Sequence, residues 1–284
     1  MSTGALVLVA TPIGNLGDLS ERAVAALRDA DVVAAEDTRR TRALLSHLGI
    51  SGGGRLRAIH GHNERSEARR VVELVASGKQ VVYVSDAGTP GIADPGERLV
   101  RACIDADLPV GMVPGPSAAL AALVLSGLPT SRFRFEGFLP RKGGGRAERI
   151  ADIADADSTV VLYESPHRIV ATLQDLLDAL GPDRAVAVAR ELTKLFEEVI
   201  RGPLGDIAAQ VNAASAARGE HVIVVGPAAR NEHVDDDTLT QAVTHAIVNG
   251  ASARDAAATV ARDLGIPRRR AYDAALRVRA KARN

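Results

Sequence analysis

The chain has 284 residues, of which 46 % are hydrophobic and only 2 % aromatic, and its formal net charge is +0. This length predicts two or three domains, and a neutral chain without tryptophan argues against a global basic field or aromatic stacking as the main mode of nucleic-acid binding. The single cysteine, Cys103, excludes an intramolecular disulfide and a cysteine-rich metal site, and the lack of a leader-like or membrane-length apolar run favours a cytoplasmic protein with no membrane partner.

Five apolar runs in the first half of the chain predict buried strands. They cover residues 6–10, 32–35, 56–60 and 110–113, together with the run that begins at Val81. Helical patterns follow several of these runs, beginning after Ser20 and near Glu67 and Glu97. Strands that alternate with helices predict a mostly parallel α/β sheet.

The first predicted strand leads into a loop, Thr11–Asp18, that is rich in Gly and Pro. This loop is not a dinucleotide-binding fingerprint, because its glycine spacing differs and Pro12 interrupts it. It is not a phosphate-binding P-loop either, because no Gly-Lys-Ser/Thr sequence follows. Ordinary Rossmann cofactors and nucleoside triphosphates are therefore disfavoured.

Charged residues follow the second and third predicted strands. The segment 36–41 combines two carboxylates with Arg39 and Arg40, which are suited to holding phosphate. Acidic residues in the first turn of a helix, favoured by the helix dipole, explain part of the same pattern. Further on, His60 and His62 precede Glu64, but no further His or Cys cluster completes a metal coordination shell. Hydrogen bonding to a substrate or acid–base chemistry is the favoured interpretation.

The loop after the central strand contains the strongest local signal in the chain. Residues 85–96 include three glycines and two prolines, with Asp86 and Asp94 among them. Glycines let a ligand approach the backbone closely, and prolines stiffen the turn. An ordinary turn needs one or two such residues, so this density predicts a ligand site just beyond the carboxyl end of the strand.

The second half repeats the arrangement of strand and polar cluster. Residues 159–163, 185–189 and 221–225 read as strands, the alternating segment from Arg132 as another, and 196–201 as a strand that pairs with 185–189. Polar clusters at 164–168, 190–194 and 219–220 adjoin them. The segment 141–146 reads as a flexible basic loop that either orders on phosphate or is simply solvated. A cleft between two α/β domains would collect these clusters.

A polar segment, 227–237, reads as a linker to a basic helical tail. Helices are predicted over 239–248, from a Ser252 cap with Asp255 in the capping-box position to Gly265, and from Pro267 onward. From Ala251 to the end, nine Lys or Arg against three Asp or Glu give a net charge of +6. This helix-turn-helix-like pattern predicts a nucleic-acid handle, and a structural bundle with a solvated basic face is the alternative.

The segments at the strand ends also carry a resemblance. They are Ala10-Thr-Pro-Ile-Gly-Asn-Leu-Gly-Asp18, Ala35-Glu-Asp-Thr-Arg39, His62-Asn-Glu64, Ser85-Asp-Ala-Gly-Thr-Pro90, Asp94-Pro-Gly96, Pro114-Gly-Pro116, Gly137-Phe-Leu-Pro140, Tyr163-Glu-Ser165, His167-Arg168 and Arg190-Glu-Leu-Thr-Lys194. As a set they resemble the bacterial 16S rRNA (cytidine-2′-O)-methyltransferases, within the tetrapyrrole-methylase (class III) group of S-adenosylmethionine-dependent enzymes. The resemblance covers about residues 5–226 and departs from the family at 52–54 and 143–145.

The resemblance implies two α/β domains with S-adenosylmethionine in the cleft between them, a small C-terminal helical domain, and a homodimer. The expected domains are 1–113, 114–228 and 229–284. The implied reaction is methylation of a cytidine ribose 2′-hydroxyl at the decoding centre of 16S rRNA in the small ribosomal subunit. Two alternatives stay open: a methylase of a small tetrapyrrole, and a non-enzymatic nucleic-acid binder that senses S-adenosylmethionine.

The resemblance and the residue types together give three sets of candidate site residues and no metal ligand. The expected cofactor contacts are Pro12, Ile13, Gly14, Asp86, Ala87, Gly88, Thr89, Pro90, Ile92, Asp94, Pro114, Gly115, Pro116, Ser117, Ala118, Tyr163, Glu164 and Ser165. The candidates for the base that accepts the hydroxyl proton are Glu36, His62, Glu64 and Lys194. The expected RNA contacts are Arg39, Arg40, Arg141, Lys142, Arg168, Arg190, Arg268, Arg269 and Arg270.

Overall fold

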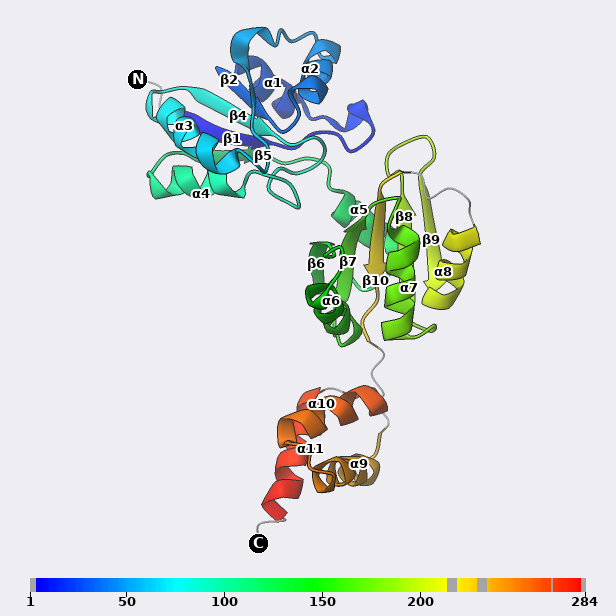
Figure 1. Cartoon of the computed structure of the whole chain (residues 1–284). Helices are drawn as coiled ribbons and strands as arrows, with labels where there is room; N and C mark the ends of the chain where they lie inside the picture. The colour runs from blue at the N-terminus through cyan, green and yellow to red at the C-terminus, as the bar shows by residue number, and fades with distance from the viewer. Residues whose placement is uncertain (1–3, 214–218, 229–233, 267, 282–284) are drawn as a thin grey trace.

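The computed structural model describes residues 4–213, 219–228, 234–266 and 268–281. Within these ranges it contains two five-stranded sheets with their covering helices, followed by a group of three helices (Figure 1). The predicted fold class, two α/β units and a helical C-terminal region, is thereby confirmed.

The first sheet is wholly parallel, with the strand order β3-β2-β4-β1-β5. Its strands are β1 (Ala5–Val9), β2 (Val32–Ala35), β3 (Leu56–Ala58), β4 (Gln80–Val84) and β5 (Val110–Val113). Its helices are α1 (Glu21–Asp29), α2 (Thr38–His47), α3 (Glu64–Ala76) and α4 (Glu97–Asp105), with short 3-10 turns η1 (Leu16–Asp18) and η2 (Gly53–Arg55). Helices α1 and α2 contribute to the core on one face, and α3 and α4 to the core on the other. Because every strand runs the same way, all five carboxyl ends meet at one edge.

The second sheet is mixed, with the strand order β6-β7-β10-β8-β9. Its strands are β6 (Phe133–Phe138), β7 (Thr159–Glu164), β8 (Ala185–Arg190), β9 (Glu198–Pro203) and β10 (His221–Val225). Helices α6 (Gly144–Ala154), α7 (Ile169–Leu180) and α8 (Leu204–Ala213) pack on one face, and α5 (Ala118–Ser126) packs on the other.

Strand β10 runs antiparallel to both of its neighbours in this second sheet. In the register, its first residue, His221, lies opposite Glu164 at the end of β7 and Arg190 at the end of β8. The beginning of β10 therefore lies at the same sheet edge as the carboxyl ends of β7 and β8.

The three C-terminal helices share a small apolar core of their own. They are α9 (Asp236–Val248), α10 (Ala253–Leu264) and α11 (Arg268–Lys281). Leu239 and Val243 of α9 pack with alanines of α10 and α11. The core of these helices therefore combines alanines with a few larger side chains such as Val260 and Ile266.

Local hydrogen bonds explain where the elements begin and end. The predicted Ser252 cap is confirmed, because the Asp255 amide donates to Ser252 Oγ at 3.1 Å, and the Ser252 hydroxyl also donates to the Asp255 carboxylate. Helix α9 starts at Asp236, earlier than predicted, because Asp235 caps it by accepting from the Thr238 amide. The predicted helix start at Pro267 lies outside the described residues.

Two segments differ from the sequence-based expectation. Strand β3 ends at Ala58 instead of residue 60, because the Asn63 side chain closes a turn by accepting from the His60 amide and donating to the Ala58 carbonyl. The prediction of a flexible loop over 141–146 is wrong for its last three residues, because α6 begins at Gly144 and Arg146 is buried. The Arg146 guanidinium pairs with Asp175 at 2.7 Å and also donates to the Pro140 carbonyl.

Within the described ranges, no helix combines the length and apolar character needed to cross a membrane.

Candidate active site

A cleft of about 430 Å³ lies where the loops at the edges of the two sheets meet. The first sheet contributes Ile13, Glu36, Arg40 and the loop from Asp86 to Asp94, without Pro90 or Gly91. The segment leading into α5 and the second sheet contribute Ser117, Ala118, Phe138, Tyr163, Glu164, Ser165, Pro166, Glu191, Leu192, Lys194, Glu220, His221 and Val222. A concave site with many converging polar groups at strand ends has the form of a ligand-binding site.

The central loop is held against the first loop by backbone hydrogen bonds. Thr11 and Gly88 form an antiparallel bridge in which each amide donates to the other residue's carbonyl at 2.9 Å. Gly88 has a φ of +74°, and a Cβ at this position would lie 3.4 Å from Cγ2 of Ile13. This position therefore favours glycine for its backbone conformation, whereas a Cβ would make only an ordinary contact with Ile13.

Strained backbone gathers around the cleft. Among the described residues, the non-glycine residues with positive φ are Ala93 (60°), Asp107 (54°), Glu191 (51°) and Thr193 (67°). Ala93 and Glu191 line the cleft, and Thr193 lies between two residues that do. Such conformations cost free energy and are retained where surrounding contacts impose them, commonly at ligand sites.

The two α/β units touch at the mouth of the cleft. A Cβ on Gly14 would lie only 2.5 Å from Cγ of Lys194, so the first loop packs directly on residues 193–194. The Lys194 ammonium forms an ion pair with Glu191 at 2.8 Å. Gly14 and the 190–194 loop thus form one contact between the two units.

Tyr163 forms part of the wall in the second unit. Its ring packs against Phe135 and Phe138, with centroid separations of 4.9 and 5.6 Å. Its hydroxyl oxygen accepts a hydrogen bond from the Ala119 amide at 3.3 Å, and burial raises the pKa of the phenol. These contacts fix the ring at the edge of the sheet.

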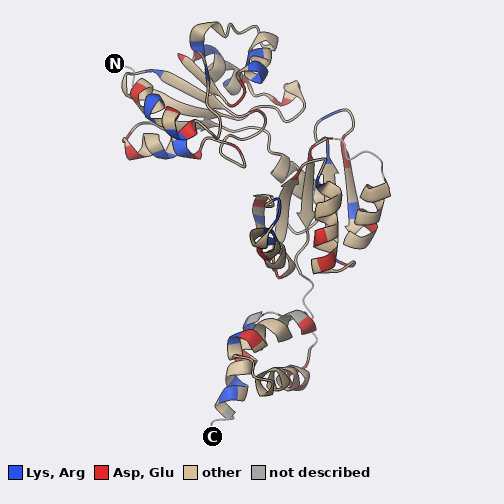
Figure 2. Cartoon of the chain, in the orientation of Figure 1, with Lys and Arg blue, Asp and Glu red and all other residues tan. Residues whose placement is uncertain are grey.

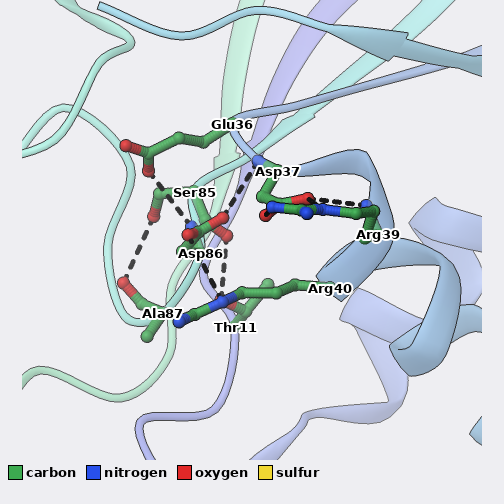
Figure 3. A network of polar contacts seen from close by, with 8 residues as sticks. All are labelled: Thr11, Glu36, Asp37, Arg39, Arg40, Ser85, Asp86 and Ala87. Atoms are coloured by element: carbon green, nitrogen blue, oxygen red, sulfur yellow. Dashed lines mark hydrogen bonds and ion pairs between the residues drawn. The ribbon is translucent and has the colours of Figure 1, made fainter.

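A network of acidic groups and two arginines lies at the ends of β2 and β4 (Figure 3). The Asp86 carboxylate accepts from the Asp37 amide at 3.0 Å and faces Arg40 Nε at 3.6 Å. The Asp86 amide donates to Glu36 at 3.4 Å. Figure 3 shows Glu36 and Arg40 on opposite sides of Asp86, with Arg39 turned toward Asp37. The carboxylates of two neighbouring strands are thereby brought together.

Most of the charged side chains in the cleft lining are acidic. The lining contains six carboxyl groups, those of Glu36, Asp86, Asp94, Glu164, Glu191 and Glu220, against the two cationic side chains of Arg40 and Lys194. Burial, with the nearby Glu36 charge, raises the pKa of Asp94 to about 6. Burial also raises the pKa of Glu36 and lowers that of His221. Like charges confined in this way are stabilised by a positively charged ligand.

Twelve of the predicted cofactor contacts line the cleft. They are Ile13, Asp86, Ala87, Gly88, Thr89, Ile92, Asp94, Ser117, Ala118, Tyr163, Glu164 and Ser165. The structure places six others outside this lining: Pro12, Gly14, Pro90, Pro114, Gly115 and Pro116. Pro12 lines a neighbouring cavity, and the Pro116 carbonyl accepts from the Thr89 hydroxyl, so these residues shape the loops that form the walls.

The four candidate bases occupy different environments. Glu36 and Lys194 line the cleft, whereas His62 is exposed beside His60 and outside it. Glu64 is buried and also outside the lining, where its carboxylate accepts from the amides of Gly96 and Arg98 at 2.8 and 3.0 Å. The Glu64 carboxylate therefore accepts hydrogen bonds from amides at the N-terminus of α4, which is a structural role.

The arginines and the lysine expected to contact RNA are dispersed. Arg40 lines the cleft, and Arg39 is exposed and paired with Asp37. Arg168 pairs with Glu164, Arg190 with Glu198, and Arg270 with Asp236. Arg141, Lys142 and Arg269 are exposed, and the side chain of Arg268 lies outside the described residues. Figure 2 shows Lys and Arg along α2 and α11.

Several lining residues were not among the sequence-based site candidates: Ala93, Phe138, Pro166, Glu191, Leu192, Glu220, His221 and Val222. The last three are at the start of β10. Glu220 belongs to the 219–220 cluster that a cleft between the units is expected to collect, whereas His221 and Val222 fall within a predicted strand. The polar pair Glu220–His221 beside a strand was the available signal, but only the antiparallel direction of β10 places it in the cleft. Among the described residues, no group of three or more His, Cys, Asp or Glu is arranged to hold a metal ion.

Comparisons with known proteins agree with this architecture. The family model of the tetrapyrrole (corrin/porphyrin) methylases matches residues 5–208. A protein of Mycobacterium tuberculosis named ribosomal RNA small subunit methyltransferase I is 46 % identical over 280 residues, 98 % of this chain and 97 % of that protein. A Xylella fastidiosa protein of the same name is 51 % identical over 231 residues, 81 % of this chain and 84 % of that protein.

A solved structure shares the fold at lower sequence identity. The Thermus thermophilus uroporphyrin-III C-methyltransferase, crystallised with S-adenyl homocysteine, superposes with a TM-score of 0.54 at 23 % identity. The match covers 78 % of this chain and 97 % of that chain. Family model, relatives and fold together show that the chain belongs to the tetrapyrrole methylase family, and within it to the group of proteins named ribosomal RNA small subunit methyltransferase I.

Proposed function

We propose that the protein is an S-adenosylmethionine-dependent methyltransferase that methylates the ribose 2′-hydroxyl of a decoding-centre cytidine in 16S rRNA of the small ribosomal subunit. The relatives' shared name supports ribosomal RNA of the small subunit as the substrate. The observation that carries the proposal is the acidic cleft formed by the two sheet edges, because it suits a cationic methyl donor.

The residues present fit S-adenosylmethionine. This cofactor, when bound, supplies an electrophilic methyl group on a positively charged sulfur and leaves as the neutral thioether. Asp86 and Asp94 would balance the positive charges of the sulfonium and amino groups. The Gly88 backbone and the ring of Tyr163 provide uncharged surfaces for the remainder of the molecule. We propose the twelve predicted contacts in the lining as the cofactor-binding residues.

Glu36 is the base that the geometry favours. A ribose hydroxyl must lose its proton as its oxygen bonds to the methyl carbon, and a carboxylate with a raised pKa accepts a proton more readily. Glu36 is half-buried in the lining, and burial raises its pKa. Lys194, the other candidate in the cleft, is ion-paired as an ammonium, which has no lone pair with which to accept a proton.

RNA contacts would lie around the cleft and not at its acidic floor. Arg40 is exposed at the rim, and Arg39, Arg141, Lys142 and Arg269 are exposed elsewhere. Arg168 and Arg190 have carboxylate partners within the second unit, so a role in holding the backbone would require them to exchange those partners. The basic C-terminal helices add a second region of positive charge.

We also propose that the protein acts as a homodimer in the cytoplasm. Helix α5 contains no charged residue, yet Leu120 and Val124 on its outer side are 53 % and 71 % exposed. A helix that is apolar all round is normally covered on both sides. Light scattering on the full chain tests this assembly, with twice the chain mass expected and a shift toward monomer for Val124→Glu.

Methyl transfer from labelled S-adenosylmethionine to small ribosomal subunits lacking this modification tests the activity. Nucleoside analysis of the recovered RNA should place the label in 2′-O-methylcytidine. Label in another nucleoside would refute the proposed acceptor. If a tetrapyrrole offered as the acceptor became labelled while the RNA stayed unlabelled, the result would favour a tetrapyrrole methylase. Binding of the cofactor without any methyl transfer would favour a sensor.

A further inference from the structure

A second cavity, of about 320 Å³, lies directly beside the cofactor cleft. It opens between the first loop, which contributes Pro12 and Leu16, and one side of α2. Only Arg40 and Asp86 belong to both linings. A molecule in this cavity would therefore be separated from a ligand in the cleft by a single ion pair.

One face of α2 forms the longer wall of this second cavity. Arg40, Leu44 and His47 are four and three residues apart, so their side chains project from the same side of the helix. Ala43 adjoins them and leaves space above the helix. The wall therefore presents an apolar middle with a guanidinium at one end and an imidazole at the other.

The two neighbouring cavities differ in charge. The cleft holds six carboxyl groups, whereas Asp86 is the one carboxylate of the second lining and already accepts from the Asp37 amide and faces Arg40. The remaining polar groups of the second cavity are hydroxyls of Thr11, Thr41 and Ser85 with Arg40 and His47. This combination suits an uncharged ring with a hydrogen-bonding edge and an attached anion.

We propose that this second cavity binds the acceptor nucleotide, a pyrimidine ribonucleotide of the RNA, with its ribose directed at the Asp86–Arg40 boundary. The base would lie between the apolar side chains of Pro12, Leu16 and Leu44. Arg40 and His47 would hold the flanking phosphates, since guanidinium and imidazole groups both donate to phosphate oxygens. The inference rests on the proposed function, and it explains how an anionic substrate reaches a cleft lined by carboxylates.

Filling the second cavity tests the inference without removing a charge from the cleft. Ala43→Trp places a large ring in the cavity at an exposed position, and Ser46→Trp places the same ring on the same helix at an exposed position outside the lining. Ala43→Trp should lower kcat/KM for undermethylated small subunits by about 100-fold, because a misplaced acceptor loses the benefit of alignment. Affinity for S-adenosylmethionine, measured by calorimetry, should be unchanged, and Ser46→Trp should behave as the parent protein.

A direct binding measurement separates this inference from the proposed activity. Cytidine 3′-monophosphate, used as the probe with the full chain, should show saturation-transfer signals that Ala43→Trp abolishes and His47→Ala weakens. Wild-type kcat/KM in Ala43→Trp, or a probe signal unaffected by that substitution, would overturn the inference. If the parent protein transfers no methyl to RNA, the proposed function fails, and the probe measurement still decides whether the cavity takes a pyrimidine nucleotide.

Discussion

At the scale of single residues, Asp94 is the carboxyl group whose ionisation bears most directly on binding in the cleft. Its folded-state pKa, about 6, lies above its ordinary value of 3.8 because it is buried near Glu36. A raised carboxyl pKa means that the protonated form is favoured in the empty protein, so stability falls as the pH rises from about 4 through 6. A bound cation would reverse this preference by favouring the carboxylate.

The affinity for S-adenosylmethionine should therefore rise between pH 5 and pH 7, as Asp94 ionises. Calorimetry in buffers of different ionisation enthalpy should detect proton release on binding near pH 6. Asp94→Asn should flatten the pH dependence and weaken binding at neutral pH, while making the empty protein more stable. An unchanged pH profile in Asp94→Asn would assign the titration to another group.

Glu36 is the second residue at this scale. Glu36→Gln should lower kcat by about 10²- to 10⁴-fold, because the amide cannot accept the hydroxyl proton. The descending acidic limb of the pH–rate profile, which a base with a raised pKa produces, should disappear in the variant. Rapid-quench measurement of a single turnover isolates the chemical step. A wild-type rate in this variant would show that Glu36 is not the base and would leave Lys194 as the candidate in the cleft lining.

At the scale of elements, Glu64 links α3 to the start of α4. Its carboxylate accepts from the amides of Gly96 and Arg98, which lie 32 and 34 residues further along the chain. Gly96 also closes the 85–96 loop, so the same contact holds the loop that lines the cleft. This is a tertiary replacement for a local helix cap.

Glu64→Ala should lower the free energy of unfolding by about 1–3 kcal/mol, because the buried Gly96 amide and the part-buried Arg98 amide lose their acceptor. Urea denaturation at neutral pH measures this change. Glu64→Gln retains a carbonyl acceptor and should recover part of the loss. A variant with normal stability but abolished methyl transfer would contradict the structural role and restore Glu64 as a candidate base.

The sequence predicts a part of the cleft wall correctly where that part depends on residues close together in the chain. The glycines, prolines and aspartates of 85–96 have short-range physical causes, and so does the Ser252–Asp255 cap. The cluster at 219–220 is expected in a cleft between the two units, but His221 is not, because its position depends on the direction of β10, a property of the whole second sheet. The contacts between Gly14 and Lys194 and between Glu64 and Gly96 join distant segments, and no local pattern encodes them.

At the scale of the whole molecule, the chain combines a neutral total with an uneven distribution of charge. Six carboxyl groups line the cleft against two cationic side chains, whereas the tail from Ala251 onward carries a net charge of +6. The three C-terminal helices pack on each other through their own apolar core. Their contribution to RNA binding should therefore be separable from cofactor binding.

Deleting residues 232–284 should leave calorimetric affinity for S-adenosylmethionine unchanged and weaken binding to the small subunit. The logarithm of the binding constant should also fall less steeply with the logarithm of salt concentration, because fewer counterions are released from the RNA. Filter binding over a range of salt concentrations gives the slope. An identical slope in the truncated protein would make the tail a structural bundle with a solvated basic face.

The acidic lining of the cleft has a consequence for turnover. The methyl donor carries a positive charge on its sulfur, and the product of methyl transfer does not. The product would therefore balance one negative charge fewer among the carboxylates of the lining. The attraction that draws the donor in is therefore reduced by the reaction itself. Product inhibition should be weak at low ionic strength, and each methylation should make the exchange of used cofactor for new more favourable.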